Sequence, residues 1–179
     1  KDKSRKSELF LRYNFNAGWS KMVKKEFLIN HNIKFDKTIG SEDVILSTKI
    51  GYFMDHFEVS SDIIYCITVS YGSNSRILSE NHFDLRLNAR VSRINFLNKN
   101  LSKKDLENIM KPLILNKAAE LLLLSLRMFG LKKFLQVYKL YKKDNIKWFR
   151  IIYLNPIKII KYIIAGMIKY IRNNRYNTS

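Results

Sequence analysis

Residues 41–56 read SEDVILSTKIGYFMDH, and the fold of the first half of the chain depends on this stretch. Ser41 is a favoured residue at a helix N-cap, and the acids Glu42 and Asp43 suit the positive end of the helix dipole. The residues that follow place one set of side chains on a single helix face: Val44, Ile45, Thr48, Tyr52 and Phe53. We therefore predict a helix that begins at Glu42, runs to about His56 and buries that face.

The segments on either side of this helix have different patterns. Upstream, residues 8–30 carry apolar residues at mixed spacing, and Gly18 interrupts them. Downstream, large apolar residues alternate with smaller or more polar ones: Ile63, Tyr65, Ile67 and Val69. Such alternation indicates a strand with one buried face, and we predict a strand there.

The chain becomes helical in pattern from His82 onward. A first helix is predicted over about 83–98. Ser102 and Asp105 then have the spacing of a capping box, with Asp in place of the usual Glu, so a second helix is expected to begin there. With the strand upstream, this pattern predicts an α+β fold that is mostly helical.

Two further helices are predicted before residue 144. Leu113–Leu126 is apolar almost all round, which is typical of a buried helix. Gly130 is expected to end it and to separate it from a basic helix over 131–143.

Composition excludes several classes of protein. Of 179 residues, 46% are hydrophobic, which excludes a disordered polybasic tail. The single cysteine, Cys66, excludes an intramolecular disulfide and a multi-cysteine zinc site. The net charge of +18 is uneven: residues 1–80 carry +2 and residues 81–179 carry +16. This asymmetry predicts an anionic partner, either nucleic acid or a membrane.

The last segment has the pattern of a helix lying in a membrane surface. Asn155-Pro156 is a helix start, and no acid follows Asp144. On a helical wheel, isoleucines dominate one half and basic residues the other, and lysines interrupt the segment too often for a transmembrane span. We predict that five residues contact a membrane surface: Trp148, Lys158, Lys161, Lys169 and Arg172. The alternative is a helix that packs on its own domain and exposes a basic face.

The sequence contains no phosphate loop, dinucleotide fingerprint, HExxH or GxSxG motif. The three histidines, His31, His56 and His82, are scattered and are expected to be surface or packing residues. No metal site is predicted in this chain.

The stretch from Trp19 to Ser75 resembles the C-terminal part of the catalytic domain of family 2 glycosyltransferases, which have the GT-A fold. The resemblance covers about residues 15–76 and depends on the order of its elements, each of which is weakly specific alone. These elements are Trp19, Lys21, Lys25-Glu26-Phe27-Leu28, Asn32-Ile33-Lys34-Phe35, Glu42-Asp43, Ile64-Tyr65 and Ser73–Ser75. The basic helices after residue 82 resemble the tails of such enzymes less specifically.

The resemblance implies roles for four residues. Asp43 would be the general base that takes a proton from the acceptor hydroxyl in an inverting transfer from a nucleotide-sugar. Its place in the first turn of a helix favours the anionic form. Glu42 would bind acceptor hydroxyls, Trp19 would stack on a sugar ring, and Lys21 would reach the diphosphate or hold Asp43. Acids in the first turn of a helix are also common without any catalytic role.

The chain departs from the family in lacking the upstream nucleotide-binding half. No Asp-x-Asp motif occurs, and no alternating strands and helices precede residue 15. We therefore expect residues 1–80 to be the acceptor-side end of an incomplete catalytic domain, and residues 81–179 a basic helical region. Alone, such a fragment is expected to be inactive and to hold no cofactor. The full-length enzyme would use a divalent metal, Mg²⁺ or Mn²⁺.

The expected function is then transfer of a sugar from a nucleotide-sugar donor to a glycan or lipid-linked acceptor. The protein would lie in the cytoplasm, at the inner face of the membrane, held by an anionic lipid surface. The alternative is a basic helical module that binds nucleic acid or a membrane surface without catalysis. Nucleic acid is the less expected partner, because the basic residues lie on amphipathic helices and no nucleic-acid motif occurs. A helical scaffold without chemistry would leave the pattern from Trp19 to Ser75 unexplained.

Overall fold

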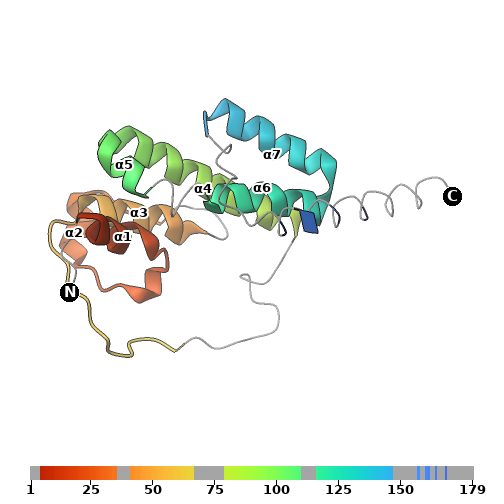
Figure 1. Cartoon of the computed structure of the whole chain (residues 1–179). Helices are drawn as coiled ribbons and strands as arrows, with labels where there is room; N and C mark the ends of the chain where they lie inside the picture. Colours follow the sequence, from red (N-terminus) through yellow and green to blue (C-terminus); the bar gives the residue numbers. More distant parts are fainter. Residues whose placement is uncertain are drawn as a thin grey trace. The chain divides into compact units, whose positions relative to one another are not determined.

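The computed structural model describes residues 5–35, 41–66, 79–109 and 116–146, together with Ile157, Ile160, Lys161, Ile164 and Ile168. All regular secondary structure in these residues is helical (Figure 1). The chain divides into two compact units, Lys1–Asp105 and Leu106–Ser179. This division falls after α4 (Glu80–Asn100), because α4 packs on α3 (Glu42–Phe53); the division expected from the sequence was after residue 80.

α3 is the central helix of the first unit. The other helices of this unit are α1 (Arg5–Asn14), the 3-10 helix η1 (Gly18–Ser20), α2 (Lys25–Asn30), α4 and the first part of α5 (Lys103–Ile109). α1, η1 and α4 all pack against α3, and its residues 44–48 are all buried. The single buried face predicted for this helix was therefore too narrow.

The start of α3 is at Glu42, as predicted, and its end is at Phe53 rather than near His56. The predicted side-chain cap is wrong. Ser41 has a left-handed backbone (φ 65°), and its side chain makes no hydrogen bond to the first turn. Its carbonyl oxygen instead accepts from the amide of Val44 (3.1 Å).

α1 crosses α3 at Gly51, where the two backbones come very close. A methyl group at Gly51 would overlap the carbonyl oxygen of Arg12 and lie 3.1 Å from that carbonyl carbon. A residue without a side chain is required wherever two helix backbones approach this closely. Gly51 therefore fixes where α1 can pack.

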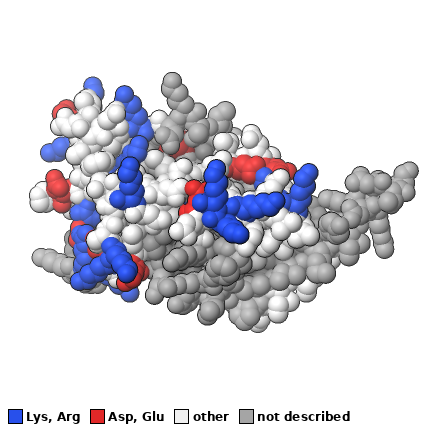
Figure 2. Space-filling view, turned by 90° about the horizontal axis from the view of Figure 1, so that it is seen from above, with Lys and Arg blue, Asp and Glu red and all other residues white. Residues whose placement is uncertain are grey.

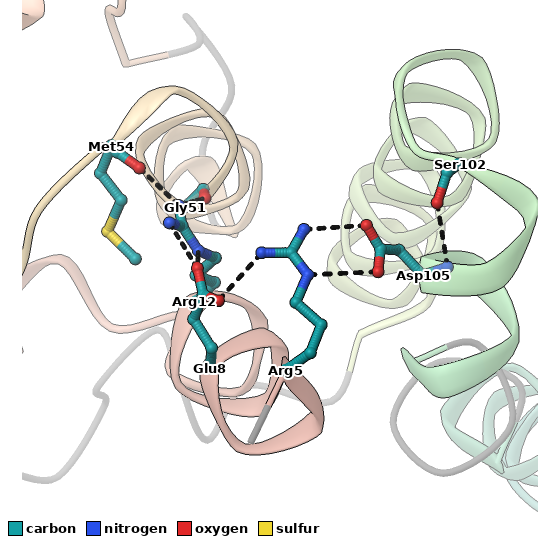
Figure 3. A network of polar contacts seen from close by, with 7 residues as sticks. All are labelled: Arg5, Glu8, Arg12, Gly51, Met54, Ser102 and Asp105. Atoms are coloured by element: carbon teal, nitrogen blue, oxygen red, sulfur yellow. Dashed lines mark hydrogen bonds and ion pairs between the residues drawn. The ribbon is translucent and has the colours of Figure 1, made fainter. Parts of the chain in front are cut away.

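The Arg12 side chain holds the same crossing together (Figure 3). Its Nη1 donates to the carbonyl oxygens of Gly51 (2.9 Å) and Met54 (2.5 Å), at the C-terminus of α3. Glu8 fixes the guanidinium from the other side, with Nε and Nη2 both 2.7 Å from its Oε1. A cation bonded to the last carbonyls also complements the negative end of the helix dipole.

The turn after α1 is anchored to both α3 and α4. The Ser47 hydroxyl donates to the carbonyl oxygen of Asn16 (2.7 Å). The buried guanidinium of Arg93 donates to the Asn16 side chain (3.0 Å) and to the carbonyl oxygen of Tyr13. Burial, assisted by the nearby charge of Arg90, lowers the pKa of Arg93 to about 10. These bonds hold the turn that leads into η1.

Arg5 joins the first helix of the unit to its last (Figure 3). Its guanidinium donates to both carboxylate oxygens of Asp105 (2.8 and 3.3 Å) and to Glu8 (2.9 Å). The Ser102 hydroxyl accepts from the amide of Asp105 (3.2 Å), so the predicted serine cap is confirmed. The Asp105 carboxylate pairs with Arg5, and the hydrogen bonds from Arg5 lower the pKa of Asp105.

An Asn-Ile pair ends a helix in each unit. After α2, Asn32 has a left-handed backbone (φ 47°), and the amide of Ile33 donates to the carbonyl oxygen of Leu28 (2.8 Å). After α7 (Leu131–Lys143), Asn145 and Ile146 repeat this arrangement. Both isoleucines are buried. This is the Schellman helix stop, in which asparagine tolerates the left-handed position and the next residue packs inward.

The strand predicted over 63–69 is not observed in its described part. Residues 57–66 contain no helix or strand, and Ile63, Ile64 and Tyr65 are exposed. Ile67 and Val69, like the loop after them, lie outside the described residues. The described residues contain no strand with which this segment can pair, so the α/β character expected for this unit is not seen in them.

The second unit contains a helical hairpin of α6 (Asn116–Phe129) and α7 (Figure 1). Gly130 connects the two helices with φ 84°, a conformation that favours glycine, and the predicted break there is confirmed. The Tyr141 hydroxyl donates to the carbonyl oxygen of Ala118 (3.0 Å) and so joins the end of α7 to the start of α6.

The described residues of the C-terminal region are helical and exposed: Ile157, Ile160, Lys161, Ile164 and Ile168. The predicted start of this helix at Asn155-Pro156 lies outside the described residues. Within the ranges that the structure describes, no helix is long and apolar enough to cross a bilayer.

Gly51→Ala is expected to lower the free energy of unfolding by about 2 kcal/mol, because the added methyl group forces α1 off α3. The sign is informative, since Gly→Ala inside a helix otherwise stabilises by about 1 kcal/mol. Gly18→Ala is the matched control. Its methyl group would meet its neighbours at 3.9 Å or more, so a change within about 0.5 kcal/mol is expected. Urea unfolding followed by circular dichroism measures both, and equal stability of the two variants would contradict the close crossing.

Asp105→Asn is expected to reduce the loss of stability in acid. The Asp105 pKa is lower in the folded chain than in the unfolded chain, so its contribution is present above about pH 4 and is lost as the pH falls through the folded value. The pair is partly exposed, so the effect is about 0.5–1 kcal/mol. Unfolding in urea at a series of pH values measures it. Asp55→Asn, at an exposed acid of the same unit, is the control and is expected to keep the wild-type pH dependence.

Candidate functional site

The N-terminal end of α3 lies against η1, and this contact forms the candidate site. A methyl group at Gly18 would lie 3.9 Å from the Cβ of Asp43 and 3.9 Å from the ring of Phe35. The turn that carries Trp19 is therefore next to the turn that carries Asp43. Two parts of the glycosyltransferase-like pattern, the segment with Trp19 and the segment with Glu42-Asp43, are therefore close together.

In the described residues, Asp43 acts on its neighbours through its charge and makes no hydrogen bond. Its side chain is half-buried, and no described residue donates a hydrogen bond to its carboxylate or forms an ion pair with it within 4.0 Å. It stands in the first turn of α3, where the amides at the helix start favour negative charge. Its oxygens remain available to accept a hydrogen bond from a ligand.

Glu42 precedes Asp43 and contains a polar atom in an unusual environment. Its Oε2 atom is buried and has no hydrogen-bond partner among the described residues. A buried acceptor without a donor costs about 1–3 kcal/mol, and such groups in folded proteins call for an explanation. A donor supplied by a ligand or by water would satisfy this oxygen.

Lys21 lies between η1 and α2 and supports the turn before η1. Its Nζ donates to the carbonyl oxygens of Phe15 (2.6 Å) and Ala17 (3.0 Å). Burial lowers the pKa of Lys21, and the negative charge of Asp43 partly offsets this. Lys21 thus interacts with the charge of Asp43, but the hydrogen bonds that its ammonium group makes are to backbone carbonyls.

Trp19 forms a stacked pair with Tyr65. The ring centroids are 5.3 Å apart with an angle of 21° between the planes, and the residues are 49% and 55% exposed. Tyr65 was not predicted as a site residue, although Ile64-Tyr65 belongs to the sequence pattern. The stack fixes the segment before Cys66 beside η1 and gives the site an aromatic surface open to solvent.

The structure thus places all four residues predicted for catalysis and acceptor binding at one end of α3 or beside it: Trp19, Lys21, Glu42 and Asp43. Of the five residues predicted to contact a membrane, Lys161 is described and is exposed. The other four lie outside the described residues: Trp148, Lys158, Lys169 and Arg172.

The described residues do not fit the divalent metal that the resemblance implies for the whole enzyme. No group of three or more His, Cys, Asp or Glu side chains within the described ranges comes together in a way that would hold an ion. The histidines described there have other surroundings: His31 stacks on Phe53 at 4.5 Å, and the His82 ring lies 2.7 Å from the hydroxyl of Ser79.

Tyr65→Ala is expected to shift the fluorescence of Trp19 to longer wavelength and to lower the free energy of unfolding by about 0.5–1 kcal/mol, because the stack is lost. The chain has two tryptophans, so the measurement is made with Trp148→Phe in the background. Tyr65→Phe keeps the ring and is expected to leave the spectrum unchanged. An unchanged spectrum in the alanine variant would show that the two rings do not stack in solution.

Comparisons with known proteins identify no relative of this chain. No protein-family model, no curated protein and no solved structure matches it significantly.

Proposed function

We propose that the site at the N-terminal end of α3 is the acceptor side of an inverting glycosyltransferase that resembles family 2. In this proposal the sugar comes from a nucleotide-sugar, and the acceptor is a glycan or a lipid-linked glycan. Membership of the family is itself part of the proposal, and it depends on the sequence pattern from Trp19 to Ser75.

One observation carries the proposal: the Asp43 carboxylate has no hydrogen bond or ion pair in the described residues, and the Cβ of Asp43 lies next to the turn that bears Trp19. A carboxylate at a helix N-terminus is commonly explained by the helix dipole alone. The dipole does not explain why the turn that packs against α3 carries a half-exposed tryptophan stacked on Tyr65. Carboxylates and aromatic rings together recognise sugars, because hydroxyls bond to the acid and the apolar face of the sugar ring packs on the aromatic ring.

The chemistry assigned to Asp43 is general-base catalysis. The acceptor hydroxyl donates a hydrogen bond to the carboxylate, and its oxygen attacks the anomeric carbon of the donor. The hydroxyl proton passes to Asp43, and the bond from the anomeric carbon to the diphosphate oxygen breaks. The diphosphate leaves with that electron pair. A positioned base of this kind contributes about 10²–10⁴-fold to the rate.

The neighbouring residues would bind and orient the acceptor. Glu42 would bind a second hydroxyl of the acceptor; its Oε2 is buried and has no described donor, so this oxygen would have to become accessible when the acceptor binds. The open face of the Trp19–Tyr65 stack would hold the sugar ring. Lys21 would keep the turn before η1 in place through its bonds to Phe15 and Ala17.

The proposal assigns only the acceptor side to the described residues. The nucleotide-sugar, with the Mg²⁺ or Mn²⁺ that such enzymes use, would be held by residues outside them. A cytoplasmic location at the inner face of the membrane belongs to the same proposal, because lipid-linked acceptors are presented there.

Asp43→Asn is expected to lower transfer at least about 100-fold while leaving acceptor affinity within about threefold, because the amide still binds hydroxyls but takes no proton. Transfer is measured with labelled nucleotide-sugars on the protein that cells express from the complete gene. Acceptor binding is measured on the chain itself with an oligosaccharide array, followed by titration of the Trp19 fluorescence. Trp19→Ala is expected to abolish this binding.

Asp55→Asn is the matched control, since Asp55 is an exposed acid that follows the C-terminal end of α3, opposite to the end that carries Asp43. It should change neither transfer nor binding. Transfer at the wild-type rate in Asp43→Asn would exclude Asp43 as the base. Oligosaccharide binding that survives Trp19→Ala would exclude the aromatic pair as the sugar platform. If both results were obtained, neither the base nor the sugar platform would stand, and the alternative of a binding module without catalysis would remain.

A further inference from the structure

Four isoleucines of the second unit are exposed at positions that the structure describes as helical. Ile157, Ile160, Ile164 and Ile168 are helical, and their exposed fractions lie between 51% and 61%. At 100° per residue their directions fall within an arc of about 80°. We refer to these four residues as the isoleucine stripe.

Lys161 lies at the edge of this stripe and is also exposed. By the same wheel its direction is about 20° beyond that of Ile168. A lysine at the boundary of an apolar face can lay its methylene chain along that face and keep its ammonium group in a more polar layer. Apolar and cationic groups thus meet along one line of the helix, as they do in helices that lie in a lipid interface.

Acids accompany the lysines and arginines over much of the described chain, but α7 and the region of the isoleucine stripe lack them. Figure 2 shows Asp and Glu side chains between the Lys and Arg side chains of the face it presents. Among the described residues, Arg5 forms an ion pair with Asp105, and Lys117 with Glu120. After Asp144 the sequence contains no acid, and every charged residue is Lys or Arg. The positive charge of this region is therefore not neutralised by acids of its own segment.

We propose that the isoleucine stripe docks on an anionic lipid surface, with the helix axis in the plane of that surface. Nucleic acid would neutralise the lysines and arginines but would leave four isoleucines in water. An anionic lipid surface provides both an apolar layer for the stripe and phosphate groups for the flanking cations. This inference does not depend on the proposed glycosyl transfer, because it uses residues of the second unit only.

The test is sedimentation of the full chain with vesicles of two compositions. One is phosphatidylcholine alone, and the other contains about one-third phosphatidylglycerol. The wild-type chain is expected to bind the anionic vesicles. Ile160→Gln/Ile164→Gln is expected to weaken that binding at least about tenfold. Two isoleucine side chains that would be buried in the lipid are lost, and the charge does not change. Lys161→Gln is expected to weaken it about fivefold, on the anionic vesicles only.

Leu131→Gln/Leu135→Gln is the matched control. These leucines are exposed to a similar degree on α7 of the same unit, and the substitution is equally polar and uncharged. This variant is expected to bind vesicles as the wild type does. Circular dichroism and urea unfolding establish that all variants keep the α6–α7 hairpin.

Three results would overturn the inference. The first is equal vesicle binding by the wild type and the isoleucine variant, which would mean that charge alone is responsible. The second is an equal loss in the leucine variant, which would place the contact on α7 instead. The third concerns single-stranded RNA. If the chain bound RNA more tightly than anionic vesicles, and the isoleucine variant lost RNA affinity by as large a factor as it lost vesicle affinity, nucleic acid would be identified as the partner.

Discussion

The close approach of α1 and α3 at Gly51 is the constraint on which the first unit depends. Because Gly51 has no side chain, the backbone of Arg12 can lie directly against α3. The Arg12 guanidinium then reaches two carbonyl groups at the C-terminus of the same helix. Hydrogen bonds to a charged group contribute about 1.5–3 kcal/mol each when well formed. A glycine and an arginine thus fix one end of the central helix.

The consequences of this crossing reach the other end of α3. The chain leaves α1 at Asn14, and the bonds that Ser47 and Arg93 make to Asn16 hold the turn that follows. That turn leads directly into η1, so Gly18 comes to lie beside Asp43. Glu8 and Arg5 extend the same set of bonds to Asp105. Burial alone would raise the pKa of Glu8, but its hydrogen bonds from Arg5 and Arg12 outweigh burial and lower it.

Sequence reasoning succeeded for most local signals, with the side-chain cap by Ser41 as an exception. The start of α3 at Glu42, the break at Gly130 and the cap by Ser102 all depend on residues within one turn of the feature. It failed where the outcome depends on distant partners. The strand predicted from Ile63 onward has the right alternation, but a strand forms only beside another, and the described residues offer none.

The candidate site was predictable only in part, because some of its features depend on local sequence and others on contacts between distant residues. Asp43 and Trp19 were identified from the order of residues along the chain. The contact of Gly18 with α3 was not predicted, because only the folded chain brings the turn of Gly18 next to Asp43. Tyr65 was missed as a member of the site, since stacking on Trp19 spans a long stretch of sequence. The role of Gly51 was missed entirely, because a close helix crossing leaves no local sequence signal.

The residues of the glycosyltransferase-like pattern separate into two groups once their contacts are known. Asn32 and Ile33 end α2 by a backbone arrangement that Asn145 and Ile146 repeat in the other unit, so folding alone accounts for them. The ammonium of Lys21 is bonded to backbone carbonyls and likewise has a structural task. Asp43 has no hydrogen bond or ion pair in the described residues, although its charge complements the start of α3 and the ammonium of Lys21. Folding thus accounts less fully for Asp43 and for Glu42, whose buried Oε2 has no described donor, and the proposed role in acceptor binding or catalysis depends on these two residues.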